Sequence, residues 1–269
     1  MGQNDVEQLE QAVHEREGKR LTSANSMSQW KQMWRLRLIQ KLKKLADEHG
    51  GETMFDFANM ERGRYKEAVK DFSGFLKLYP ECSFAYVGRG DVYHALKQYT
   101  KAIKDYTWAI TRLGMRDSDV FARRGDAYRI QHEHFKAIMD LNRAIRLEPC
   151  PAVVYAIRGD AYCARGKYGR AMRDFSEAIK LEPDYPGSYA ARGKLYADLG
   201  QYDAARKDFN KAIALDNKYV DSYGRRGMVW IEQGRYDMAI KDFDKAKSLD
   251  SEKGSEYARL GEIRRDVYM

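Results

Sequence analysis

The chain has 269 residues, a formal net charge of +8 and a pI of about 9.2. It can bury a sizeable core, and no apolar run is long enough to span a bilayer. Its charge permits an acidic partner without requiring nucleic acid, and its three cysteines lack paired spacing, which argues against a disulfide framework and favours the cytoplasm or another reducing compartment.

The N-terminus is polar and acidic, unlike a signal peptide or an arginine-rich transit peptide. Residues 5–17 are predicted to form a short helix with Val6, Leu9 and Val13 on one side. A link rich in Lys, Ser and Asn follows at about 18–27. We therefore expect an N-terminal arm, residues 1–48, that precedes the main fold.

Residues 28–48 of this arm predict a basic amphipathic helix. Its apolar stripe includes Trp30 and Trp34, and its basic residues include Arg35, Arg37 and Lys41. Such a helix can cap a helical array, fit a partner's groove or lie on a membrane surface. We favour the cap, whose outer face can still bind a partner, over the membrane surface.

From residue 49 onward the sequence is periodic. Glycines recur every 34 or 35 residues: Gly90, Gly125, Gly159, Gly193, Gly227 and Gly261. Glycine inside a helix costs about 1 kcal/mol relative to alanine, so its regular return indicates close helix packing. Twelve residues after five of these glycines stand Ala102, Ala137, Ala171, Ala205 and Ala239, which we expect to meet the glycines from a second helix. Prolines at 80, 149 and 183 are expected to end second helices.

A charged pattern has the same period. An arginine precedes five of the glycines, and an aspartate follows each of them fifteen residues later: Arg89 and Asp105, Arg124 and Asp140, Arg158 and Asp174, Arg192 and Asp208, Arg226 and Asp242. We interpret them as bridges between the two helices of a repeat. The alternative, a row of ligand-binding arginines, is less favoured because a ligand contact would vary between repeats.

These landmarks resemble the tetratricopeptide repeat (TPR) family over about 49–269. The resemblance implies an all-α, right-handed superhelical solenoid with helical caps at both ends. Six helix–turn–helix repeats are expected at 49–82, 83–117, 118–151, 152–185, 186–219 and 220–253, followed by a capping helix at 254–269. The first repeat is degenerate, as terminal repeats commonly are.

The resemblance also implies a concave groove lined by the first helices, where a partner's helix or extended peptide would lie. We expect the following residues to line it: Val87, Asp91, Ala122, Arg123, Asp126, Arg129, Ala156, Asp160, Ala190, Lys194 and Arg225. The acids lie toward its N-terminal half, which favours a basic partner segment there. The alternative is a groove that is merely solvated. The residues do not match the carboxylate clamp by which some TPR co-chaperones bind heat-shock proteins.

Trp108 is a separate candidate, because its counterparts in later repeats are polar and the position is therefore expected to face outward. An exposed tryptophan can anchor an interface, although it can also be incidental. His132 and His134 give only a weak metal signal. We find no phosphate-binding loop or nucleophile elbow, and we expect no catalytic residue, metal or cofactor.

The sequence therefore predicts a non-enzymatic scaffold for protein partners. The favoured hypothesis is a subunit or assembly factor of a larger complex that binds partner segments in the groove and docks through its N-terminal helices. The alternatives are a free adaptor or co-chaperone and a peripheral membrane adaptor. Nucleic acid binding is disfavoured, and the sequence leaves the partner and the oligomeric state open.

Overall fold

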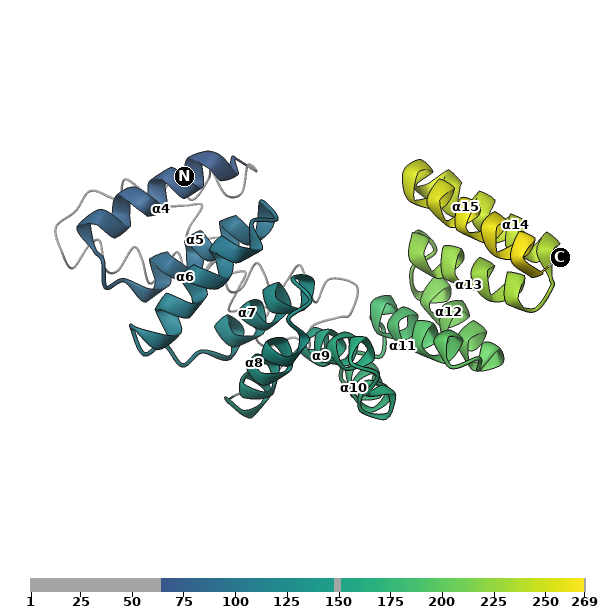
Figure 1. Ribbon diagram of the computed structural model, residues 1–269, viewed down its shortest axis with the longest axis horizontal. Helices are drawn as coiled ribbons and strands as arrows, with labels where there is room; N and C mark the ends of the chain where they lie inside the picture. Colours follow the sequence, from purple (N-terminus) through teal and green to yellow (C-terminus); the bar gives the residue numbers. More distant parts are fainter. Residues whose placement is uncertain (1–63, 148–150, 269) are drawn as a thin grey trace, which may run out of the picture. The chain divides into compact units, whose positions relative to one another are not determined.

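A computed structural model of the chain describes residues 64–147 and 151–268, with side chains as far as Glu262 (Figure 1). Every regular element in these residues is an α-helix. The helices are α4 (Tyr65–Leu78), α5 (Ser83–Ala95), α6 (Tyr99–Thr111), α7 (Ser118–Ile130), α8 (His134–Leu147), α9 (Ala152–Ala164), α10 (Tyr168–Leu181), α11 (Pro186–Asp198), α12 (Tyr202–Leu215), α13 (Val220–Glu232), α14 (Tyr236–Leu249) and α15 (Ser251–Tyr268). The described part of the chain is thus an all-α array of short helices.

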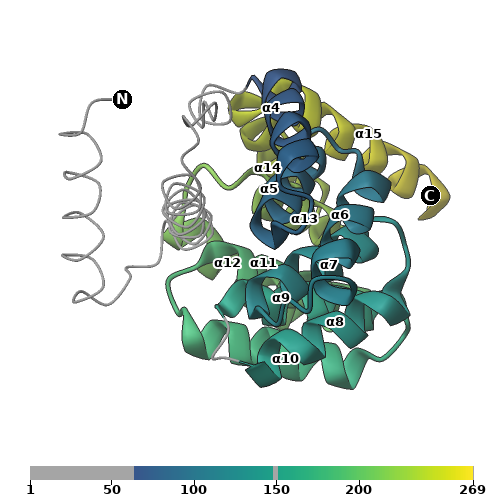
Figure 2. The same cartoon turned by 90° about the vertical axis from the view of Figure 1, so that its left-hand side faces the viewer.

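The chain divides into two compact units, Met1–Ala161 and Tyr162–Met269, with the boundary inside α9. In the first unit, α5 packs against α6 and α7 packs against α8 (Figures 1 and 2). In the second, α11 packs against α12, α13 against α14, and α15 against both α13 and α14. Each unit is therefore built from helix pairs that stack on the next pair along the chain.

The turn inside each pair has a fixed geometry. One residue per turn adopts positive φ: Lys97 (58°), His132 (61°), Gly166 (66°), Gly200 (73°) and Gly234 (69°). The next residue donates its amide to a carbonyl five residues back, as Gln98 does to Tyr93 at 2.8 Å. This is the bonding pattern that commonly ends a helix at a left-handed residue. The backbone conformation of these turns therefore repeats with the same period of 34 or 35 residues as the sequence.

The periodic glycines allow close packing, but their contact differs from the predicted one. A Cβ at Gly90 would lie 2.7 Å from the ring of Tyr106, and one at Gly193 would lie 2.9 Å from the ring of Phe209. The large residue of the second helix thus meets the glycine, where we had expected the small alanine. Tyr106 and Phe209 are fully buried, so each ring fills the space that the glycine leaves.

The helix ends agree with the proline pattern, because α4 ends at Leu78 and α10 ends at Leu181, two residues before Pro80 and Pro183. The final helix, α15, begins at Ser251, inside the predicted sixth repeat. The repeat boundaries and the handedness of the superhelix stay predictions.

Candidate functional site

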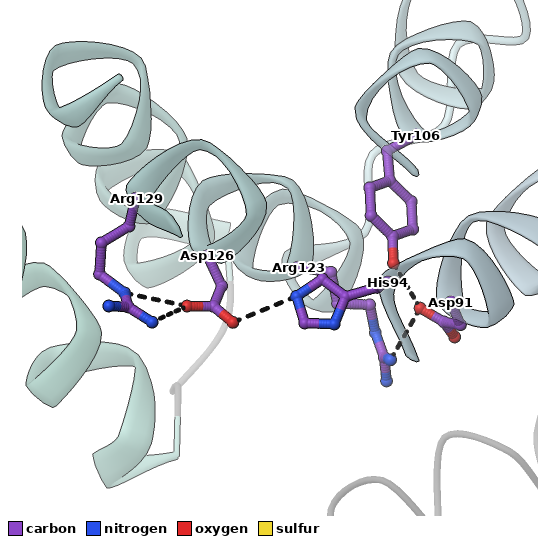
Figure 3. Close-up of polar contacts among 6 residues, drawn as sticks. All are labelled: Asp91, His94, Tyr106, Arg123, Asp126 and Arg129. Carbon is purple, nitrogen blue, oxygen red and sulfur yellow. Dashed lines mark hydrogen bonds and ion pairs between the residues drawn. The ribbon is translucent and has the colours of Figure 1, made fainter. Parts of the chain in front are cut away.

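A polar network joins α5, α6 and α7 in the first unit (Figure 3). Asp91 on α5 is its first acceptor. Its Oδ1 accepts hydrogen bonds from the Tyr106 hydroxyl at 2.7 Å and from Arg123 Nη1 at 3.0 Å. Since Asp91 and Arg123 belong to successive helix pairs, this contact ties one predicted repeat to the next.

Asp126 on α7 is the second acceptor. Its Oδ1 accepts from Nε and Nη2 of Arg129 at 3.0 and 2.8 Å, and His94 Nε2 lies 3.4 Å from its Oδ2 (Figure 3). His94 comes from α5, so the contact again spans two helix pairs. Four predicted groove residues, Asp91, Arg123, Asp126 and Arg129, therefore lie in two polar clusters, one centred on Asp91 and one on Asp126, which together we call the α5–α7 network.

Burial and nearby charges shift the pKa values of two groups in this network, Asp126 and Tyr106. Burial raises the pKa of Asp126, but bonds from His94 and Arg129 and the Arg129 charge outweigh it, so the pKa lies below 3.8. Burial and the nearby Asp91 carboxylate raise the pKa of Tyr106 well above 10.0, which keeps its hydroxyl protonated as a donor. The two carboxylates are thus offset by two guanidinium groups, and this part of the predicted groove is not a bare acidic surface.

The other groove residues of the first unit differ in exposure. Val87 and Ala122 are 0 and 2% exposed, so they offer almost no surface. Ala156 is half-buried and Asp160 is exposed. Val87 and Ala122 therefore belong to the packed interior of the unit, and the predicted groove that these residues would line stays a prediction.

The second unit has its own polar cluster, which the sequence did not reveal. Asp221 on α13 accepts hydrogen bonds from Tyr257 Oη at 2.7 Å and Lys253 Nζ at 2.8 Å, both from α15. Burial raises the pKa of Asp221, but these two bonds and the nearby Arg225 charge bring it below 3.8. A Cβ at Gly224 would lie 2.2 Å from the Tyr257 ring, so the small residue there accommodates α15.

Three predicted groove residues lie in this unit. Lys194 on α11 is exposed, Arg225 on α13 is half-buried near Asp221, and Ala190 is buried. Among the residues described in this unit, no hydrogen bond or ion pair joins these three side chains, in contrast to the α5–α7 network of the first unit. Their role in binding stays a prediction.

The structure shows the recurring Arg–Asp bridge within each unit, at Arg89–Asp105, Arg124–Asp140, Arg192–Asp208 and Arg226–Asp242. In each case Nε and Nη2 donate to the two carboxylate oxygens at 2.6–2.9 Å. The aspartates are buried, so these bidentate bridges connect the two helices inside the fold. Their arginines are therefore structural and do not form a row of ligand-binding residues.

Each of these four arginines, and Arg158 as well, also makes two contacts that sequence reasoning missed. Its Nη1 donates to a residue of the preceding second helix, and its guanidinium lies over an aromatic ring three residues earlier. The acceptors are Ser73, Thr107, Asn142, Ser176 and Asn210, for Arg89, Arg124, Arg158, Arg192 and Arg226 respectively. The rings are Tyr86, Phe121, Tyr155, Tyr189 and Tyr223, at 5.5–5.9 Å. One arginine side chain therefore connects three helices. The feature of the sequence that could have revealed this role is the aromatic residue that recurs every 34 or 35 residues, three positions before each arginine.

Trp108 on α6 is 41% exposed, and its ring lies 6.0 Å from that of Tyr86 with the Arg112 guanidinium 5.7 Å from its centroid. The N-terminal candidates Trp30, Trp34, Arg35, Arg37 and Lys41 lie outside the described residues. Within the described ranges, no group of three or more metal-ligating side chains occurs. Among these same residues, no helix has the length and hydropathy to cross a membrane.

Comparisons with known structures place this arrangement of helices. The chain is similar to a tetratricopeptide repeat protein from Parabacteroides merdae, at 21% identity, a TM-score of 0.64, and coverage of 76% of this chain and 80% of that one. It is similar to PilW, described as a widely conserved type IV pilus biogenesis factor, at 17% identity and a TM-score of 0.65, covering 73% and 90%. Its similarity to a chain of the APC/C hetero-tetramer Cut9–Hcn1 has 18% identity and a TM-score of 0.67, covering 84% of this chain and 46% of that one.

Sequence comparisons agree. No curated protein matches the chain significantly. A family model described as TPR repeat matches residues 159–200, and one described as Tetratricopeptide repeat matches residues 58–114 and 190–254. Together these matches cover more than half of the chain, and they include the helix pairs α5–α6, α11–α12 and α13–α14 with their Arg–Asp bridges. The chain belongs to the tetratricopeptide repeat family.

Proposed function

We propose that this protein is a non-enzymatic scaffold that holds a segment of another protein along its first helices. The α5–α7 network carries this proposal. It fixes charged side chains of two successive helix pairs in place before any partner arrives, which lowers the entropy lost on binding. Asp126 and Arg129 remain partly exposed, with 21 and 30% of their side chains accessible, so they can contact a partner.

The balance of charge refines the kind of partner. Asp91 and Asp126 are each bonded to an arginine, so a purely basic peptide would find their charge already offset. A segment with mixed polar groups, which can accept from the arginines and donate to the carboxylates, fits the α5–α7 network better. Asp160, which is exposed, extends the candidate surface of the first unit onto α9.

We infer further that the chain works as a subunit or assembly factor of a larger complex in a reducing compartment, docking through residues 1–48. Cut9–Hcn1 is described as a hetero-tetramer of APC/C and PilW as a biogenesis factor, and both have this helical fold. A free adaptor that binds peptide segments transiently is the second candidate, supported by the exposed parts of Asp126 and Arg129. A membrane-surface role for residues 28–48 and nucleic acid binding are not favoured.

The test is native affinity capture with cross-linking mass spectrometry on the intact chain, a 1–48 deletion, and an Asp126→Asn/Arg129→Gln variant. The matched control is Asp203→Asn/Arg206→Gln, which removes an i, i+3 pair from α12. A stoichiometric partner set that is lost with the deletion supports the complex subunit. Substoichiometric partners that survive the deletion but are lost with the network variant support the adaptor. Equal capture by the network and control variants would refute a role for the α5–α7 network.

A further inference from the structure

The second helices of the first unit have an unusual exposed face. It consists of Lys104, Trp108 and Arg112 from α6 and its end, and Phe135, Met139 and Arg143 from α8, all exposed; we call it the α6–α8 face. Trp108, Phe135 and Met139 are 41, 62 and 43% exposed. Three large apolar side chains thus lie among three cations. Of the residues in the α5–α7 network, only Tyr106 belongs to these two helices.

One guanidinium contacts both helices that carry this face. Arg124 donates to Thr107 Oγ1 on α6 at 3.1 Å and to both carboxylate oxygens of Asp140 on α8 at 2.7 and 2.9 Å. Trp108 directly follows Thr107, and Arg143 lies one helical turn after Asp140. Arg124 therefore brings the part of α6 around Thr107 close to the part of α8 around Asp140.

The cations of this face have no exposed acid on their own helices. The only acids within α6 and α8 are Asp105 and Asp140, which are 5 and 3% exposed and already hold Arg89 and Arg124. Arg143 lies 3.8 Å from Asp140, a carboxylate whose oxygens are both bonded to Arg124. Exposed acids are therefore absent from α6 and α8, and Lys104, Arg112 and Arg143 give the face a positive charge beside its apolar side chains.

The same surface in the second unit is different. The helices α12 and α14 expose Asp203, Asp237 and Asp244, which mix with their lysines. At the position of Trp108 they carry Lys211 and Lys245. The composition of the α6–α8 face thus differs in its exposed acids from that of α12 and α14, although α14 also exposes Met238 and Ile240.

We propose that the α6–α8 face is a docking surface for an acidic amphipathic segment of another protein. Charge complementarity selects the acidic side chains of that segment, and Trp108, Phe135 and Met139 take its apolar side chains. A nucleic acid fits less well, because Arg112 already lies over the Trp108 ring where a base would stack. This surface is separate from the one in the proposed function, so either can fail without the other.

The experiment measures the binding of a defined probe to the full chain. The probe is a fluorescent synthetic helix with glutamates on one face and leucine and phenylalanine on the other, followed by anisotropy at low and physiological salt. A second peptide keeps the glutamates and replaces the apolar residues with alanine. The variants are Trp108→Ala/Phe135→Ala and Lys104→Ala/Arg143→Ala, and the matched control is Lys207→Ala/Lys211→Ala on α12. Circular dichroism checks that each variant is folded.

We expect the apolar variant and the alanine peptide each to weaken binding by about tenfold or more, as the loss of an interface anchor commonly does. The charge variant should lower affinity and reduce its salt dependence, while the α12 control should bind normally. Equal binding to the control and to the two face variants would overturn the proposal. Tighter binding of a single-stranded RNA or of phosphatidylserine vesicles, lost in the same variants, would also overturn it. So would a gain in probe binding on deletion of residues 1–17, because the face would then belong to the chain's own acidic segment.

Discussion

The bridge between Arg124 and Asp140 should be the strongest of the periodic bridges, and replacing Asp140 with alanine tests this. The side chains of Arg124 and Asp140 are 7 and 4% exposed, whereas those of Arg192 and Asp208 are 21 and 9% exposed. Asp140→Ala removes the two hydrogen bonds between Arg124 and Asp140 and leaves the buried guanidinium with its bond to Thr107. Removing one partner of a buried pair in this way costs about 3–5 kcal/mol.

The equivalent change Asp208→Ala leaves Arg192 closer to solvent, and we expect a smaller loss of about 2 kcal/mol, in the range for hydrogen bonds to charged groups. Asp203→Ala, at an exposed pair on α12, should cost about 0–1 kcal/mol. The free energies of unfolding are measured by urea titration with far-ultraviolet circular dichroism. The variant Arg124→Met/Asp140→Leu should recover most of the loss, because it leaves no buried charge unpaired.

Two results would refute this reasoning. If Asp140→Ala costs no more than Asp203→Ala, the buried bridge does not stabilise the fold. If the Arg124→Met/Asp140→Leu double variant is as unstable as Asp140→Ala, the loss arises from packing and not from an unpaired charge.

Three further predictions follow from the turns and the C-terminal helix. Lys97→Gly should raise the free energy of unfolding by about 0.5–1 kcal/mol, because Lys97 adopts positive φ, while Gly200→Ala at the same turn position should lower it by about 1 kcal/mol; urea titration of both checks the sign. Gly224→Ala should cost about 1–3 kcal/mol, because the added Cβ would lie 2.2 Å from the Tyr257 ring, and faster amide hydrogen exchange in α15 should accompany the loss. The pKa of Asp221 is lowered in the folded state, so its stabilisation is present above about pH 4 and lost as the pH falls below that value; Asp221→Asn should flatten this part of the stability profile, and an unchanged profile would contradict it.

Periodicity explains why so much of the fold could be predicted from the sequence. A contact made in every repeat leaves the same residue type at the same spacing, as Arg89 and Asp105 do, and such a column stands out in one sequence. The second acceptors of the same arginines vary between Ser73, Thr107 and Asn142, and this variation hid an equally regular contact. A recurring contact can therefore be predicted from sequence periodicity only where each repeat uses the same residue type at that position.

The α5–α7 network could not be predicted for a different reason. The formal charges of Asp91 and Asp126 were visible, and they suggested an acidic groove. Their pairing with Arg123 and Arg129 depends on side-chain directions across two helices and recurs in no other described repeat. A charge count along the chain shows the ions but not which of them neutralise one another.

This contrast indicates where specificity lies in such a protein. A bridge that occurs in every repeat stabilises all of them alike and cannot distinguish one partner from another. Discrimination requires positions at which the repeats differ, because only these give one segment of a partner a better fit than its neighbour. The α5–α7 network and the α6–α8 face are such departures from the period, and both lie on α5 to α8. If binding is specific, substitutions on these four helices should change the choice of partner, whereas substitutions in the recurring bridges should change stability alone.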